Sequence, residues 1–107
     1  MAMDSDDTVS LGGSIQLTGF RELDRSSSII LKKIVGNYAR RFSEICQQFE
    51  SLQLTMKPVH EREKSEKYEI HALLKDKGQN YAADVTDRNL FFAIDSALKK
   101  VESEISK

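Results

Sequence analysis

The sequence predicts an α+β fold in which a four-stranded sheet carries two helices on one of its faces. Two stretches have apolar residues three and four positions apart, the spacing of a helix with one buried side. Four others alternate apolar with polar residues, the spacing of a strand with one buried face. Their order is β-α-β-β-β-α. Packing both helices on the apolar face of the sheet gives a two-layer sandwich that buries all three apolar surfaces.

Length and composition indicate one globular domain. The chain has 107 residues, of which 39% are hydrophobic and 31% charged. No apolar run approaches the roughly 18 residues that cross a bilayer, and the acidic N-terminus lacks the apolar segment of a secretory signal. We therefore expect a cytoplasmic protein with no membrane partner. Its one cysteine, Cys46, excludes an intrachain disulfide and a cysteine-rich metal site, and no cofactor is expected.

The first half of the chain predicts a tail, a strand and a long helix. Residues 1–13 are polar and acidic and predict a disordered tail, so the domain spans 14–107. Alternation over 14–20 predicts a strand, and Asp24 or one of the three serines at 26–28 can cap the helix that follows. The apolar residues of that helix share one narrow arc: Leu31, Ile34, Val35, Tyr38, Phe42, Ile45 and Phe49. Gly36 interrupts it and would permit the close approach of a neighbouring element.

The second half predicts three antiparallel strands and a final helix. Alternation predicts strands over 51–57, 68–74 and 81–85, with a charged connection at 60–67 and a tight turn at 77–80. Pro58 either ends regular pairing or sits at an edge, because it has no backbone donor. Asp87 or Asn89 can cap the last helix. That helix has one apolar stripe: Phe91, Ile94, Leu98, Val101 and Ile105.

Catalytic chemistry has no support in the sequence, and we expect the protein not to be an enzyme. There is no glycine-rich phosphate loop. The two imidazoles, His60 and His71, stand in no metal-ligand spacing, and His71 should point away from the apolar face of its strand. Cys46 lies beside the apolar arc of the long helix, the position of a structural thiol rather than a nucleophile.

Cationic residues outside the two apolar stripes are the candidates for a binding surface. The net charge of the chain is −1, and it becomes +2 without the three aspartates of the tail, so a basic surface requires clustering. The candidates for phosphate contact are Lys32, Lys33, Arg40 and Arg41 on the first helix, with Lys99, Lys100 and Lys107 on or after the second. The alternative is an ordinary solvated face with ion pairs four residues apart, such as Arg40 with Glu44.

The C-terminal segment carries a family resemblance. Residues 87–107 read DRNLFFAIDSALKKVESEISK. This segment resembles the ribosome hibernation-promoting factors, also called ribosome-associated translation inhibitors, whose last helix typically reads acidic-Met-Tyr-Ala-Ala-Ile-Asp followed by Lys-Leu-Glu. Residues 90–95 match the first run and residues 100–102 match the second. Thr18-Gly19 stands where that family has a Thr-Gly pair at the end of its first strand. The match is specific from Asp87 to Glu102.

The resemblance implies a β-α-β-β-β-α domain similar in shape to double-stranded-RNA-binding domains. It also implies binding to the small ribosomal subunit, in the channel used by mRNA and tRNA, and inhibition of translation by occupancy without catalysis. Lys100 matches an RNA-contacting lysine of the family, whereas the basic residues of the first helix match in character only. Ser103 departs from the arginine that is frequent there. The partner is then the small subunit or a structured RNA. The alternative is a protein-interaction or homodimerisation module that uses the open sheet surface or an edge strand.

Overall fold

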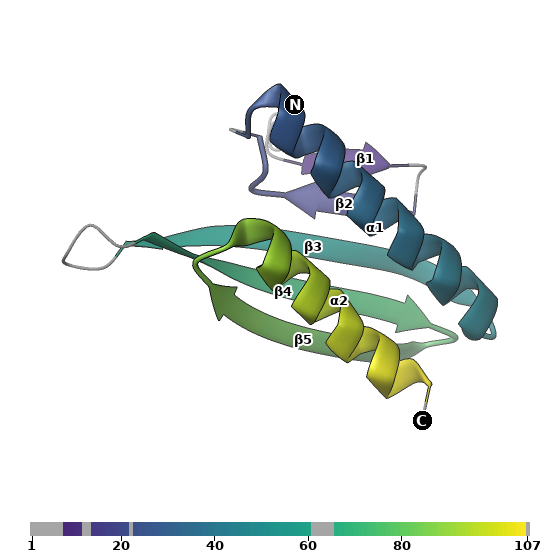
Figure 1. Cartoon of the computed structure of the whole chain (residues 1–107). Coiled ribbons are helices and arrows are strands. Elements are labelled where there is room, and N and C mark those ends of the chain that lie inside the picture. The colour runs from purple at the N-terminus through teal and green to yellow at the C-terminus, as the bar shows by residue number, and fades with distance from the viewer. Residues whose placement is uncertain (1–7, 12–13, 22, 61–65, 107) are drawn as a thin grey trace, which may run out of the picture.

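The structure is a computed structural model that describes residues 8–11, 14–21, 23–60 and 66–106. It contains two layers, a twisted sheet and a pair of helices on one of its faces (Figure 1). The elements in chain order are β1 (Thr8–Leu11), β2 (Ile15–Thr18), α1 (Arg25–Ile45), β3 (Phe49–His60), β4 (Glu66–Asp76), β5 (Gln79–Asp87) and α2 (Leu90–Ile105). The strands lie side by side in the order β1-β2-β3-β4-β5.

From β2 to α2, the predicted order β-α-β-β-β-α and the α+β class are confirmed. The three strands β3, β4 and β5 form an antiparallel meander, as predicted. β2 is parallel to β3, with Leu17 opposite Leu54, and α1 is the crossover that such a parallel pair requires. Both helices cover the same face of the sheet, with α2 over β4 and β5 (Figure 1).

The predicted disordered tail over 1–13 is wrong for residues 8–11, which form β1. This strand pairs antiparallel with β2, with Val9 opposite Leu17 and Leu11 opposite Ile15. The sheet therefore has a fifth strand beyond the four predicted. Four residues carry too short an alternation to stand out from an acidic tail, although their partner β2 is the next strand along the chain. Residues 1–7 and 12–13 lie outside the described part of the chain.

The boundaries of α1 and β3 also differ from the sequence prediction. α1 ends at Ile45, where Cys46 turns to an extended backbone, so Phe49 begins β3 instead of closing the helix. Phe49 still packs against the core, which explains why its spacing fitted the helical arc. β3 runs through Pro58 to His60, and β2 accompanies it only from Leu52 to Thr55. Pro58 therefore sits at an edge, as one of the two alternatives held.

The helix starts and the hairpin turn follow local sequence signals. The Asp24 carboxylate accepts from the Ser27 backbone N–H at 3.4 Å, and the Asn89 side-chain oxygen accepts from the Phe92 N–H at 2.9 Å. Asp24 and Asn89 are thus the caps among the candidates. Lys77 and Gly78, both at positive φ, make the turn that joins β4 to β5.

The core lies between the two layers. Its fully buried side chains come from both helices and from the inner face of the sheet: Leu17, Leu31, Val35, Phe42, Leu52, Leu54, Ile70, Leu74, Ile94, Leu98 and Val101. Each such side chain contributes about 1.5–3 kcal/mol through its removal from water. The polar residues between them in sequence therefore face outward, either on the outer sides of the helices or on the open face of the sheet.

Gly19 is held by a close backbone contact, whereas Gly36 is not. Gly19 has φ +90°, and a Cβ there would stand 2.3 Å from the Met56 carbonyl oxygen of β3. A side chain is thus excluded both by the backbone conformation and by the neighbouring strand. A Cβ on Gly36 would meet nothing within 4 Å, so the close approach expected at this glycine is absent.

These two glycines make a matched pair of alanine substitutions. We expect Gly19→Ala to lower the free energy of unfolding by at least about 2 kcal/mol, because of strain at positive φ and the clash with Met56. Gly36→Ala should raise it by about 0.5–1 kcal/mol, because alanine costs less than glycine in an exposed helical position. Urea unfolding followed by circular dichroism measures both. Equal effects of the two substitutions would contradict this assignment.

Candidate nucleic-acid interface

The candidate cations of α1 lie on three different sides of the helix. Tyr38 and Arg41 make contacts to α2, so they mark the side that faces it. Lys33 and Arg40 are seven positions apart and share the side that points away from the sheet, about 10 Å apart along the axis. Lys32 is turned by about 120° from Tyr38, onto the flank away from α2. All four cationic side chains are exposed.

The candidate cations of α2 lie on two sides. Asp95 and Glu102 face α1, since they accept from Tyr38 and Arg41. Lys99 points outward from the sheet, and Lys100 lies on the flank away from α1. Both are exposed. Lys107, the last candidate, lies outside the described residues.

Arg41 is engaged by its neighbours. Its Nη2 and Nε donate to the two carboxylate oxygens of Glu102 at 2.9 and 3.1 Å, a bidentate pair. Its guanidinium also stacks over the Tyr38 ring, 4.5 Å from the ring centroid. Among the described residues, the five candidates Lys32, Lys33, Arg40, Lys99 and Lys100 take part in no ion pair. Arg41 therefore positions the helices, and the other five remain open to a ligand.

A second bond between the helices was not anticipated from sequence. The buried Tyr38 hydroxyl donates to the Asp95 carboxylate at 2.8 Å. Burial, followed by the hydrogen bond to Asp95, raises the pKa of Tyr38 to about 12. The spacing of the apolar residues of α1 places Tyr38 on the buried side of the helix, where a phenol normally needs a partner for its hydroxyl. This need indicates that the Tyr38 hydroxyl has a partner, but it does not identify Asp95, which is 57 residues away in sequence.

The helix layer is more basic than the chain as a whole. α1 and α2 together carry seven cationic side chains and four carboxylates, whereas the whole chain has a net charge of −1. Two of those carboxylates, Asp95 and Glu102, already accept hydrogen bonds between the helices. Lys33, Arg40 and Lys99 on the outward sides thus form a modest basic surface, which we call the outer basic face. Lys32 and Lys100 lie on its two opposite margins.

The open face of the sheet carries a polar row across three strands. Thr55, His71 and Asp84 are directly opposite one another on β3, β4 and β5. His71 Nδ1 contacts the Asp84 carboxylate, and both side chains are exposed, so the predicted outward orientation of His71 is confirmed. A shallow hollow of about 210 Å³ lies beside them, lined by Thr55, Lys57, Glu69 and His71.

The described residues contain neither a cluster of metal ligands nor a helix able to span a membrane. No group of three or more His, Cys, Asp or Glu side chains is placed there to hold a metal ion. No helix there combines the length and the apolar character that a bilayer span requires. The half-buried Cys46 has its pKa raised to about 11, first by burial and then by the negative charge of Asp76. Its thiol is therefore protonated at neutral pH, as expected of a structural cysteine.

The structure defines a small α+β domain whose helix layer exposes the cations of the outer basic face. A solved structure similar to this chain is that of the N-terminal domain of Protein Y from Thermus thermophilus, with a TM-score of 0.53 and 19% sequence identity. The similarity covers 72% of this chain and 80% of that one. At this identity it shows a shared fold. No family model and no curated protein matches the sequence.

The bond between Tyr38 and Asp95 can be tested by removing one oxygen. We expect Tyr38→Phe to lower the free energy of unfolding by about 1 kcal/mol, because it deletes a partly buried hydrogen bond to a carboxylate and leaves the ring in place. Tyr68→Phe is the matched control, since among the described residues the Tyr68 hydroxyl has no hydrogen-bond partner. Urea unfolding at neutral pH measures both. Indistinguishable values would show that the bond between the helices adds nothing to stability.

Proposed function

We propose that this chain is a non-catalytic RNA-binding module that binds the small ribosomal subunit in the cytoplasm and inhibits translation by occupying it. The observation that carries the proposal is the outer basic face. Its three cationic side chains, Lys33, Arg40 and Lys99, are exposed on the side away from the sheet. They have no ion-pair partner among the described residues. Phosphate groups are the natural ligands of such a surface.

Two further observations support the ribosome as the source of the phosphates. The segment from Asp87 to Glu102 resembles the last helix of the hibernation-promoting factors, and it forms α2, which supplies Lys99 and Lys100. The structural similarity to the N-terminal domain of Protein Y supports that resemblance at the level of the fold. Neither observation depends on the charge count of the helix layer.

We propose different parts for the candidate residues in this binding. Lys33, Arg40 and Lys99 contact backbone phosphates directly. Lys100, which matches the family's RNA-contacting lysine, and Lys32 extend the contact to either side. Arg41 acts mainly as a positioning residue, because its Nε and Nη2 already donate to the Glu102 carboxylate. With few contacts of this kind, the affinity should depend on salt with a shallow slope.

Co-sedimentation with purified small ribosomal subunits at low and moderate salt tests the proposal. We expect the double variant Lys33→Glu/Arg40→Glu to bind at least about ten-fold more weakly, and its salt slope to fall by about one for each lost phosphate contact. The matched control, Lys57→Glu/Lys75→Glu, makes the same change of charge on the open face of the sheet and should bind like the unmodified protein.

Two results would contradict the proposal. One is a wild-type chain that does not bind small subunits at low salt. The other is an equal loss in the helix variant and the sheet variant, since net charge alone would then explain the effect. Either result would favour the protein-interaction alternative, with the open face of the sheet as the surface to examine.

A further inference from the structure

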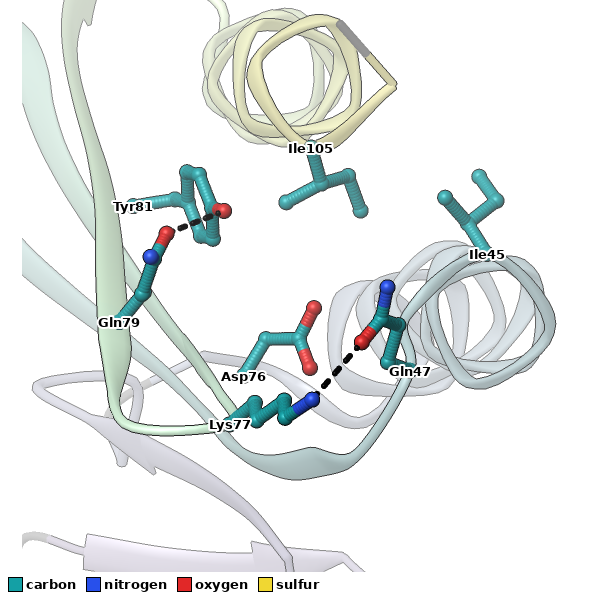
Figure 2. A pocket seen from close by; sticks show the side chains of 7 residues that line it. All are labelled: Ile45, Gln47, Asp76, Lys77, Gln79, Tyr81 and Ile105. Carbon is teal, nitrogen blue, oxygen red and sulfur yellow. Dashed lines mark hydrogen bonds between the residues drawn. The ribbon is translucent and has the colours of Figure 1, made fainter.

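A hollow lies at the end of the molecule where both helices terminate, away from the outer basic face. It is about 270 Å³ in volume and opens between the ends of α1 and α2 and the β4–β5 turn (Figure 2). The residues that line it are Ile45, Gln47, Asp76, Lys77, Gln79, Tyr81 and Ile105. Its walls are thus apolar on the helix side and polar on the sheet side.

The carboxylate of Asp76 lies in the middle of this group (Figure 2). One oxygen, Oδ1, accepts from the Gln48 backbone N–H at 2.9 Å. Asp76 takes part in no ion pair among the described residues, although Lys77 is its neighbour in sequence. The Lys77 ammonium donates to Gln47 Oε1 at 3.2 Å instead. A half-buried carboxylate therefore faces the hollow without an ion-pair partner among the described side chains.

The ends of the helices add to the negative potential. α1 ends at Ile45 and α2 at Ile105, and neither has a basic residue in its last turn. The C-terminus of a helix carries a partial negative charge of about −0.5 and presents backbone carbonyls without helical partners. Two such ends and Asp76 together outweigh the single positive charge of Lys77.

Cys46 lies close to the same carboxylate. Its thiol follows the last residue of α1, and the charge of Asp76 contributes, after burial, to the raised pKa of that thiol.

We propose that this hollow binds the side chain of an arginine from a protein partner. The guanidinium would donate to Asp76 and to the phenol oxygen of Tyr81, whose proton is already given to Gln79 at 2.9 Å. Its methylene stem would lie against Ile45 and Ile105. The volume is below the roughly 300–1,000 Å³ of ordinary small-molecule sites, which fits one inserted side chain. A planar guanidinium, which can donate two parallel hydrogen bonds to a carboxylate, suits Asp76 better than the compact ammonium of lysine.

The probe for this site is N-acetylarginine amide, with N-acetylcitrulline amide as the uncharged analogue of the same shape. We expect the arginine probe to shift the backbone amide resonances of Gln47, Asp76, Tyr81 and Ile105 saturably, with a Kd of about 1–10 mM, as suits one side chain. The citrulline probe should bind at least about ten-fold more weakly, because it lacks the charge that Asp76 attracts.

Three variants define the site. Asp76→Asn keeps an oxygen for the Gln48 N–H and should weaken the arginine probe at least about ten-fold. Lys77→Gln should tighten it several-fold, because it removes a repelling charge. Asp84→Asn, which removes a carboxylate on the open face of the sheet, should leave the affinity unchanged.

The direction in which each change alters the affinity tests the proposal. Equal binding of the citrulline probe, full affinity in Asp76→Asn, or weaker binding in Lys77→Gln would each overturn the proposal. So would the absence of saturable shifts at ten times the expected Kd. Binding of the arginine probe does not involve the outer basic face, so this test and the ribosome test can fail independently.

Discussion

The arrangement of both helices depends on one constraint, the single apolar face of the sheet. Along β4, Ile70, Ala72 and Leu74 are buried, whereas His71 between them is exposed. Each helix also has one apolar stripe, so the two helices must lie side by side on that face to bury it. The parallel pairing of β2 with β3 contributes, because it requires a crossover and α1 supplies it. The outward sides of α1 and α2 then form one surface.

The spacing of the helices on that face is set by polar contacts rather than by the core alone. Tyr38 donates to Asp95, and Arg41 forks onto Glu102 one turn further along. These contacts use two of the four carboxylates of the helix layer. They fix the distance between cations on separate helices, and the Arg41 pair also neutralises the charge of Glu102. A structural contact therefore shapes the electrostatics of the binding surface.

The periodicity of the apolar residues and local signals such as helix caps were sufficient to predict most of the fold. The stripes of α1 and α2, the alternation of β3 to β5 and the Asn89 cap are all visible within short windows of sequence. The sequence prediction missed features at short or terminal stretches of elements, where too few residues carry a pattern. β1 exists through its pairing with β2, and Phe49 has the same apolar spacing whether it ends a helix or begins a strand.

The candidate site was predicted less completely than the fold, for a related reason. Residue type and exposure identified the cations, but the side of the helix each one faces depends on where the core lies. The orientation of each helix relative to the core places Lys32 and Lys100 on opposite flanks of the helix layer. The same orientation turns Arg41 toward Glu102. The hollow around Asp76 could not be predicted, since its walls come from the ends of four elements and the turn between two of them.

The two proposed surfaces together constrain the kind of partner this domain fits. The outer basic face suits phosphates, and the hollow at Asp76 suits a guanidinium. The two surfaces would therefore bind groups of opposite charge. A bare nucleic acid supplies only the first. A surface that presents RNA phosphates beside arginine side chains of proteins supplies both, and such a surface would compensate for the low net charge of this chain. Contact at the hollow would also orient the partner. A guanidinium that donates two hydrogen bonds to the Asp76 carboxylate has a defined direction, whereas the contacts of lysines with phosphates do not.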